Sequence, residues 1–249
     1  MMILLALLLL VSPCFAQNQD LGIRDGDYVD YTQDASCLGA WRYNDDLHDT
    51  AIDSSSIGRQ GNVSGNGSIV AGQEGNCWDY DGTDDWIDYG LIDTSGLAGM
   101  SIVAWVFYDS IGTQEQTVAS NYDGVNNASG MLLRLEPSND TVEAFIVREA
   151  NTVSGGTFAD MIVPANTWTH VASVFNSTDL RVYVNGVVTG SPIAAASAMD
   201  NDPSTDPFRV GDSPHTTTDE LTGKIDEVAV FSRALSAAEI LDIYKNGIK

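Results

Sequence analysis

The stretch from residue 168 to residue 186, WTHVASVFNSTDLRVYVNG, contains two β-strand patterns and the start of a hairpin. The runs Thr169–Phe175 and Leu180–Val184 are rich in β-branched and aromatic residues and are bounded by polar residues, which is typical of strands. Asn185-Gly186 predicts a two-residue turn into Val187-Val188, because both central residues of a type I′ turn need a positive φ. In the second run apolar and polar side chains alternate, so one face of that strand meets water.

The same pattern of short strands and polar turns extends over most of the chain. It predicts an all-β sandwich of antiparallel strands rather than alternating helices and strands. The other expected strands are Leu38–Tyr43, Cys77–Tyr80, Trp86–Tyr89, Met100–Tyr108, Thr117–Asn121, Met131–Glu136, Thr141–Arg148, Phe208–Gly211 and Ile225–Phe231. Met100–Phe107 is apolar on both faces, so we expect a central strand with loops folded over its outer side.

One helix is expected, at the C-terminal end. Ser236 and Glu239 have the spacing of a capping box, and Gly247 provides a stop. The apolar residues that follow at helical spacing are Ile240, Leu241 and Tyr244. A helix of under about a dozen residues is marginal alone, so it must dock on the sandwich.

Five motifs resemble one known family in the same order along the chain. They are Asp81–Trp86, Ser101–Val106, Trp168–Ala172, Leu180–Gly186 and Gly223–Phe231, the last leading into Arg233–Ser236. They resemble the laminin-G-like, concanavalin A-like jelly-roll family, and the resemblance covers about Leu38 to Gly247. It implies a two-sheet antiparallel jelly roll with one short C-terminal helix, in which the strand ending at Phe231 lies beside the strand containing Trp41. This fold carries lectins, adhesion modules, pentraxin-like proteins and glycosidases, so it does not by itself give a function.

The N-terminus has the pattern of a secretory signal. The apolar run Ile3–Val11 is too short to span a bilayer, and Cys14-Phe15-Ala16 places small residues where a signal peptidase cleaves, before Gln17. We therefore expect a signal peptide at residues 1–16, an acidic leader at 17–36 and one jelly-roll domain at 37–249. The expected product is secreted and has no membrane span, although a retained or lipid-linked terminus is the alternative.

Charge and cysteine content restrict the partners and the compartment. The chain has 35 acidic and 11 basic residues, a net charge of −24, which excludes nucleic acid because binding to phosphates depends on Lys and Arg. Without Cys14, the mature chain has two cysteines. In an oxidising compartment Cys37 and Cys77 are expected to form a disulfide, with two separate buried thiols as the alternative.

The sequence predicts no catalytic site. A retaining glycosidase on such a sandwich needs two carboxyl groups about 5 Å apart, commonly two Glu at i and i+4 on one strand face, and no such pair occurs. Nucleophile-elbow and zinc-protease motifs are also absent, and the three histidines are scattered. His170 is interpreted as a structural hydrogen-bonding residue. We expect a protein that is not an enzyme.

Two groups of acidic residues compete as a calcium site. By the resemblance, Asp226 of the Ile-Asp-Glu-Val pattern joins Asp45 or Asp46, which follow a neighbouring strand, in holding a structural Ca²⁺. The competing group is the Asp81, Asp84 and Asp85 turn, where a cation would relieve the repulsion of three carboxylates. The structural alternative for Asp226 is a carboxylate that accepts backbone N–H bonds. For the Asp81–Asp85 turn it is the ordinary hydrogen bonding of Asp in turns.

Aromatic and amide side chains near the predicted turns are candidates for a sugar site. Such sites combine an aromatic platform with groups that bond hydroxyls. The candidates are Trp86, Tyr89, Tyr122, Asn121 and Asp123. Packing in the core is the alternative for each aromatic ring, and Trp41, Trp78, Trp105 and Trp168 are assigned to the core.

Together these features predict a secreted, non-enzymatic module that binds an extracellular or cell-surface glycan or glycoprotein, with Ca²⁺ as the candidate cofactor. A structural or adhesive surface protein without glycan binding is the alternative, and a glycoside hydrolase or polysaccharide lyase is the third hypothesis. The first predicts an open concave groove with exposed aromatic rings. The second predicts a flat or filled concave face and an exposed edge or patch for self-association, and the third predicts two acidic side chains that face each other in a groove.

Overall fold

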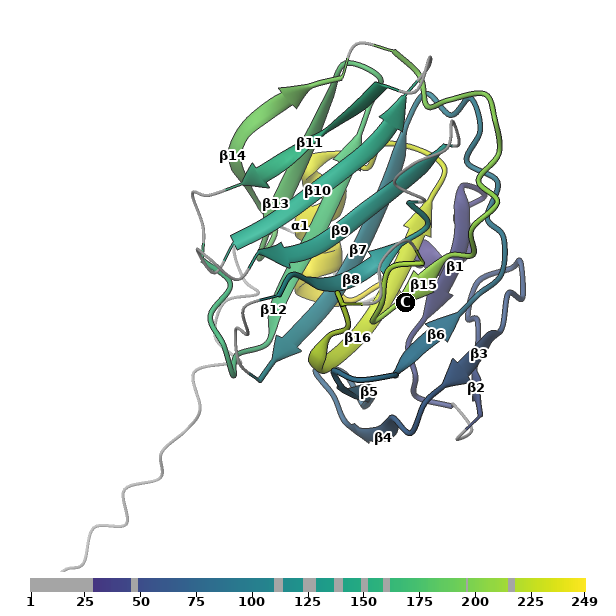
Figure 1. Cartoon of the computed structure of the whole chain (residues 1–249), viewed down its shortest axis with the longest axis vertical. Coiled ribbons are helices and arrows are strands. Elements are labelled where there is room, and N and C mark those ends of the chain that lie inside the picture. The colour runs from purple at the N-terminus through teal and green to yellow at the C-terminus, as the bar shows by residue number, and fades with distance from the viewer. Residues whose placement is uncertain are drawn as a thin grey trace, which may run out of the picture.

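The computed structural model describes residues 29–45, 49–109, 114–122, 129–136, 141–148, 152–158, 162–195, 197–214 and 218–249. Two antiparallel sheets are stacked face to face, as Figure 1 shows. The expected all-β, two-sheet antiparallel jelly roll with one short C-terminal helix is confirmed. The signal peptide and most of the leader lie outside the described residues. No helix in the described part is long and apolar enough to cross a membrane.

The first sheet has strand order β14-β13-β12-β7-β16-β5-β4, and β1 also pairs with β16. Its strands are β1 (Cys37–Trp41), β4 (Ser68–Ala71), β5 (Asn76–Asp81), β7 (Met100–Tyr108), β12 (Thr169–Phe175), β13 (Asp179–Val184), β14 (Val187–Ala194) and β16 (Thr222–Phe231). The β13–β14 hairpin turns at Asn185 and Gly186, whose φ angles of 50° and 78° confirm the predicted turn.

The second sheet has strand order β11-β10-β9-β8-β15-β6-β3-β2. Its strands are β2 (Thr50–Ala51), β3 (Gly61–Ser64), β6 (Trp86–Asp88), β8 (Gln116–Ser120), β9 (Gly130–Glu136), β10 (Thr141–Arg148), β11 (Thr152–Phe158) and β15 (Arg209–Val210). The sequence did not predict β2, β3, β4 or β11. These strands are short or polar, and pairing with a neighbour rather than hydrophobic alternation makes them strands.

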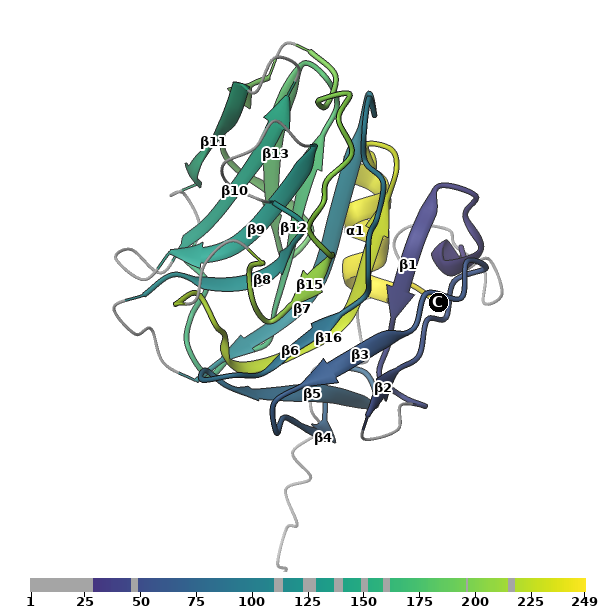
Figure 2. The same cartoon turned by 45° about the vertical axis from the view of Figure 1, so that its right-hand side comes forward.

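The strand that ends at Phe231 lies beside the strand containing Trp41, as the resemblance implies. Trp41 pairs with Val228 in an antiparallel register, and Figure 2 shows β1 alongside β16. Between the sheets, the Trp41 ring stacks on Tyr89 with centroids 3.7 Å apart and on Phe208 at 5.8 Å. These rings form part of the buried core that the two sheets share.

The helix α1 (Ala237–Asn246) covers the outer face of the first sheet. Its capping box is present, with the Ser236 hydroxyl accepting from Glu239 N and the Glu239 carboxylate accepting from Ser236 N. Ile240 and Ile243 pack in a second buried cluster with Val103 of β7. The expectation that loops cover β7 was therefore wrong, because the amphipathic helix supplies the cover. A 3₁₀ turn (Tyr31–Gln33) also joins this cluster, so the end of the expected leader packs against the domain.

The expected disulfide is not present, and the structure corrects that prediction. Cys37 and Cys77 are free and buried. Cys37 pairs with Phe231, whereas the register Trp78–Ile225 places Cys77 opposite residue 226, five residues further along β16. Five residues of strand span roughly 16 Å, far beyond the roughly 7 Å that a disulfide allows between Cα atoms.

Burial also protects both thiols from solvent reagents. It raises the pKa of Cys37 and of Cys77 to about 12, so the reactive thiolate is scarce at neutral pH. In a native chain that begins at Gln17, we expect no reaction with a thiol reagent, and two reactive thiols after unfolding in guanidinium without reductant. Absence of reactive thiols in the unfolded chain would mean that the two cysteines are bonded.

Candidate functional site

The outer face of the second sheet carries the candidate binding site. Figure 1 looks onto this sheet, with α1 behind it on the far side of the sandwich. On β6, Ile87 is buried in the core, whereas Trp86 and Asp88 are half-buried and share the outer face. On β9 and β10, Leu133 and Ala144 likewise enter the core. The alternation therefore sends every second side chain of these strands outward.

The first group on this face is centred on Arg209 of β15. Its guanidinium carbon lies 4.8 Å from the centroid of the Trp86 ring, in a cation–π arrangement. Its Nη1 donates to Asp212 Oδ2 over 2.9 Å. Its Nε lies 3.9 Å from Asp88 Oδ2, too far for a hydrogen bond. An arginine, two carboxylates and an indole thus meet at one place, and we call them the Arg209 group.

Two members of the Arg209 group carry buried polar atoms without partners. Arg209 Nε and Asp212 Oδ1 have no hydrogen-bond partner, and neither has Thr117 Oγ1 on the neighbouring strand β8. Asp212 and Thr117 are 3% and 0% exposed. A buried polar atom without a partner costs about 1–3 kcal/mol, so the unpaired donor of Arg209 and the unpaired acceptor of Asp212, two residues that contact each other, indicate a place for a polar ligand or water.

Burial has a further effect on Asp212. It raises the pKa of that carboxyl to about 6, although the Arg209 guanidinium and the backbone N–H of Ser213 act against the shift. Asp212 is therefore mainly ionised at neutral pH, where its free oxygen is a strong acceptor. The site loses this acceptor as the pH falls below about 6.

The second group on the outer face is centred on Arg134 of β9. Its Nη2 lies 2.7 Å from Glu143 and 3.4 Å from Glu115, and its Nη1 lies 3.4 Å from Asp219. The guanidinium carbon is also 5.3 Å from the centroid of the half-buried Phe145 ring of β10. Tyr122 adds a second half-buried ring, 6.4 Å from Phe145. We call these residues the Arg134 group.

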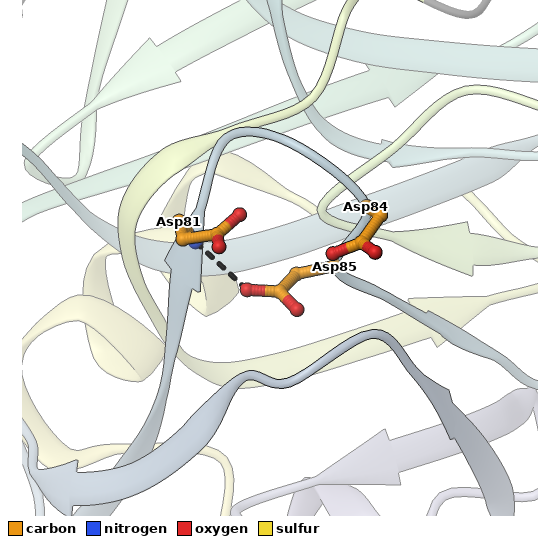
Figure 3. A group of neighbouring side chains, drawn as sticks. All are labelled: Asp81, Asp84 and Asp85. Carbon is orange, nitrogen blue, oxygen red and sulfur yellow. Dashed lines mark hydrogen bonds between the residues drawn. The ribbon is translucent and has the colours of Figure 1, made fainter.

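The acidic turn after β5 is held by a buried carboxylate, as Figure 3 shows for Asp81, Asp84 and Asp85. Asp85 is 2% exposed. Its Oδ1 accepts from Asn66 N at 2.7 Å and Gly67 N at 2.8 Å, and its Oδ2 accepts from Asp81 N at 2.8 Å. Asp85 thereby ties the β3–β4 turn to the β5–β6 turn and positions Trp86 directly after it.

Among the described residues, one group of three acidic side chains has the spacing of metal ligands. One carboxylate oxygen from each of Asp81, Asp84 and Asp85 lies within 4.8 Å of the other two. A cleft of about 360 Å³ lies beside them and is also lined by Asp79 and Asp109. Lys224 Nζ lies 3.7 Å from each of those two carboxylates, and burial raises the pKa of Asp79. Oxygen donors of this kind suit a hard cation such as Ca²⁺.

The structure gives Asp226 a different environment. It is fully buried, and its two oxygens accept from Glu74 N and Glu227 N at 2.9 and 2.8 Å. Burial raises its pKa to about 7, so the carboxyl is partly protonated at neutral pH. Asp45 is exposed, and Asp46 lies outside the described residues. In the described part, no group of three acidic ligands includes Asp226 or Asp45.

The predicted sugar-binding residues separate into two sets. Trp86 and Tyr122 lie on the outer face, in the Arg209 and Arg134 groups. Tyr89 is 2% exposed in the core, and Asn121 is fully buried, with its side-chain oxygen accepting from Met131 N at 3.0 Å. Neither Tyr89 nor Asn121 is positioned to touch a surface ligand. Asp123 lies outside the described residues.

Four of the residues on this face were missed from the sequence: Arg134, Phe145, Arg209 and Asp212. A signal was present for two of them. Arg134 and Phe145 occupy the outward positions of strands predicted as Met131–Glu136 and Thr141–Arg148, and a long cation facing an aromatic ring across neighbouring strands is a recognisable pair. Arg209 begins a strand of only two residues and Asp212 follows that strand, so no alternation of inward and outward side chains identifies them in the sequence.

The family follows from a match over most of the jelly roll. The family model Laminin_G_3, described as the concanavalin A-like lectin/glucanases superfamily, matches residues 81–241. The chain belongs to this superfamily. The match includes the acidic turn, both arginine groups and the first half of α1, and it confirms the resemblance seen in the sequence. A search of curated protein sequences gives no match.

Solved structures with this fold include domain 4 of AbnA, a GH43 extracellular arabinanase from Geobacillus stearothermophilus, in complex with arabinotriose. It is 16% identical, with a TM-score of 0.65, covering 84% of this chain and 98% of that one. The receptor-binding domain of a botulinum neurotoxin C/D mosaic serotype is 16% identical, with a TM-score of 0.62, covering 84% and 51%. The binding domain of botulinum neurotoxin DC, in complex with rat synaptotagmin II, is 13% identical, with a TM-score of 0.62, covering 86% and 52%. The chain thus spans about half of each toxin domain, and at these identities the likeness concerns the fold.

Proposed function

We propose that the chain is a secreted, non-enzymatic carbohydrate-binding module that takes a neutral extracellular or cell-surface glycan on the outer face of the second sheet. The observation that carries the proposal is the Arg209 group. There an unpaired donor on Arg209 and an unpaired acceptor on Asp212 belong to side chains that meet the half-buried Trp86 indole. A sugar presents vicinal hydroxyls that donate and accept, and an apolar ring face that packs on an aromatic ring, so it matches all of these groups.

Charge favours a neutral ligand over an anionic one. In the Arg134 group one guanidinium faces three carboxylates, and in the Arg209 group one faces two. The whole chain carries a net charge of −24. A uronate or sulfated glycan would therefore meet a negative field, and among the described residues neither group has a cation that is not already paired with a carboxylate.

The arrangement of the carboxylates supports a binding role rather than hydrolysis. A glycosidase needs an acid and a nucleophile or base that face the substrate without a cation between them. The carboxylates of Glu143, Asp219 and Asp212 are each bound to an arginine. Two solved structures of this fold are described as complexes, one with arabinotriose and one with rat synaptotagmin II, which agrees with a binding module.

The test is calorimetric titration of the full mature chain with neutral oligosaccharides selected on a glycan array. Trp86→Ala is expected to weaken binding by about 30-fold, since truncating a central aromatic contact costs about 2 kcal/mol. Asp212→Asn should weaken it by about tenfold, because the unpaired oxygen then belongs to a neutral amide. Trp168→Ala is the matched control, since Trp168 is also half-buried but lies against Phe107, directly before β12 of the other sheet. Equal binding by the Trp86 variant and the parent chain would contradict the proposal.

Calcium assistance stays a prediction. The same titrations in Ca²⁺ and in EGTA test it, with Asp84→Asn as the variant, because Asp84 is exposed and belongs to the acidic group. Loss of the difference between Ca²⁺ and EGTA in this variant would place the cation at the turn. A calcium effect that the variant retains would point to another site.

The alternative, a structural or adhesive surface protein, predicts that no glycan binds. Its expected exposed edge is β14, where Val187 and Val188 are 53% and 47% exposed. Pro192 within this strand and the positive φ of Gly190 interrupt the edge, which disfavours strand-to-strand association. Self-association in sedimentation experiments, without glycan binding, would favour this alternative.

A further inference from the structure

A buried histidine lies between the helix α1 and the first sheet. His170 belongs to β12 and is 1% exposed. Its ring centroid lies 5.5 Å from that of Trp105 on β7 and 5.9 Å from that of Tyr244 on α1. Neither Nδ1 nor Nε2 has a hydrogen-bond partner among the described residues. A protonated ring in this place would bury a charge and leave two N–H donors unpaired, so the folded chain holds the ring neutral.

The backbone of His170 is fixed within the first sheet. His170 pairs with Trp105 in the ladder between β12 and β7. Its backbone N–H donates to Asn185 Oδ1 over 3.0 Å, and its carbonyl accepts from Asn185 N over 2.8 Å. Gly186, the next residue of that hairpin, lies so close to α1 that an added Cβ would be 2.9 Å from Leu241 Cδ1. The sheet and the hairpin therefore form fixed walls around the imidazole, and α1 closes the remaining side.

Of these walls, α1 is the one that can move. Both β7 and β12 are paired on their two sides, whereas α1 has ten residues and a helix of that length is marginal without its tertiary contacts. Ile240 and Ile243 anchor it on Val103 of β7. Tyr244, which packs on His170, is only half-buried. A displacement of the last turns of α1 would therefore bring water to the imidazole and leave both sheets in place.

The carboxylate in register with His170 does not face its ring. Asp226 of β16 pairs with Trp105 from the other side of β7. Its two oxygens accept from Glu74 N and Glu227 N at 2.9 and 2.8 Å. These bonds turn the carboxylate toward the backbone, away from a role as a partner for a protonated histidine.

The other titratable side chains around His170 do not compensate a positive charge either. Tyr244 of α1 and Tyr183 of β13 are phenols, which carry no charge in acid. On α1, the Asp242 carboxylate accepts from the tyrosine hydroxyl of the 3₁₀ turn over 3.0 Å, and Lys245 is exposed. Burial lowers the pKa of His170 to about 3, and no charged neighbour contributes to this shift. Protonation near pH 5 therefore favours states in which the ring is in water.

We propose that α1 is an acid-released cover of the first sheet: protonation of His170 favours a state in which the last turns of α1 have left the sheet while both sheets stay folded. The released state exposes an apolar face that includes Val103, Ala172 and Val174. α1 lies on the side of the sandwich opposite the candidate binding face, as Figure 1 shows, so this inference does not depend on the proposed function.

The test is amide hydrogen exchange of the chain that begins at Gln17, at pH 7.5 and pH 5.0, with each rate corrected for the intrinsic exchange rate at that pH. Uncovering a histidine with an ordinary pKa of 6.5 favours the open state about 30-fold more at pH 5.0 than at pH 7.5. The protection factors of Ala237–Asn246 should fall by about this amount. At pH 5.0 they should also lie at least about 100-fold below those of β7 and β12, because α1 opens without global unfolding.

The matched variant is His170→Phe, which keeps an aromatic ring between Trp105 and Tyr244 and cannot be protonated. Its α1 protection factors should differ by less than about twofold between the two pH values. His170→Leu is the second variant, and circular dichroism verifies that each is folded.

Three results would overturn the inference. In the first, the α1 protection factors of the parent chain stay constant between the two pH values. In the second, α1 and β12 have equal protection at pH 5.0, so that α1 leaves only when the whole domain unfolds. In the third, the folded variants without His170 keep the full pH-dependent loss of α1 protection, which would assign the release to another group.

Discussion

Replacing Asp85 by alanine is expected to lower the free energy of unfolding by about 4 kcal/mol, measured by chemical denaturation. Its carboxylate accepts three backbone N–H bonds, from Asn66, Gly67 and Asp81, in a buried position. Hydrogen bonds to a charged group contribute about 1.5–3 kcal/mol each, and donors left buried without a partner add a desolvation cost. Losing the tie between two turns should therefore be among the most damaging single changes outside the core.

The neighbouring residue provides a close control. Asp84 has the same side chain one position earlier, is exposed, and lies in the same acidic group. Asp84→Ala should change the free energy of unfolding by no more than about 0.5 kcal/mol. If the two alanine variants were equally stable, Asp85 would not hold the turns together, and the position of Trp86 would need another explanation.

The second large effect is a loss of stability in acid that depends on His170. Its ring is buried between Trp105 and Tyr244 of α1, with centroids 5.5 and 5.9 Å away, and neither nitrogen has a hydrogen-bond partner. Burial lowers the pKa of His170 to about 3, from 6.5 for an ordinary histidine. Between these values the unfolded chain binds a proton that the folded chain does not, so stability falls as the pH falls.

The expected size is about 3 kcal/mol between pH 7 and pH 4.5, because each unit below 6.5 contributes about 1.4 kcal/mol. His170→Phe should remove this contribution and keep the aromatic packing. Asp226 acts in the opposite direction, since its raised pKa makes the folded chain bind more protons and adds stability as the pH falls. The parent chain and the His170→Phe variant share the contribution of Asp226. The difference between their free energies of unfolding at each pH therefore isolates the contribution of His170. If the free energies of unfolding of the two proteins changed equally between pH 7 and pH 4.5, His170 would have an ordinary pKa in the folded state.

The sequence predicted the central strands because their signal is local. Met100–Tyr108, Thr141–Arg148 and Thr169–Phe175 have the predicted bounds. The capping box at Ser236 and Glu239 was equally readable. Strands such as β3 were missed because Gly61–Ser64 carries little hydrophobic pattern and depends on its partner β6.

The candidate site was predictable only in part, because it assembles distant segments. Trp86, Arg134 and Arg209 come from three separate parts of the chain, and only the sheet order brings β6, β15 and β9 onto one face. The burial of Tyr89 could have been predicted from the sequence. With Ile87 in the core, the period of two also sends Tyr89 inward and Trp86 outward.

The Ile-Asp-Glu-Val pattern of β16 did not predict the local geometry of Asp226 and Glu227. A bulge lies between Asp226 and Ala229, and Glu227 adopts a φ of 49°. This geometry buries both carboxylates in structural roles, with Asp226 capping backbone N–H groups and Glu227 binding Arg42 Nε and Ile248 N. His170 shows the same limit, because its side chain packs among rings instead of making the hydrogen bonds expected of it.

The most direct measurement is a crystal structure of the chain with the neutral oligosaccharide that binds most tightly in titration. The account predicts sugar density on the outer face of the second sheet, with one ring packed on Trp86 and hydroxyls within hydrogen-bond distance of Arg209 Nε and Asp212 Oδ1. Sugar bound instead in the cleft beside Asp79 and Asp109, or on the face covered by α1, would contradict it.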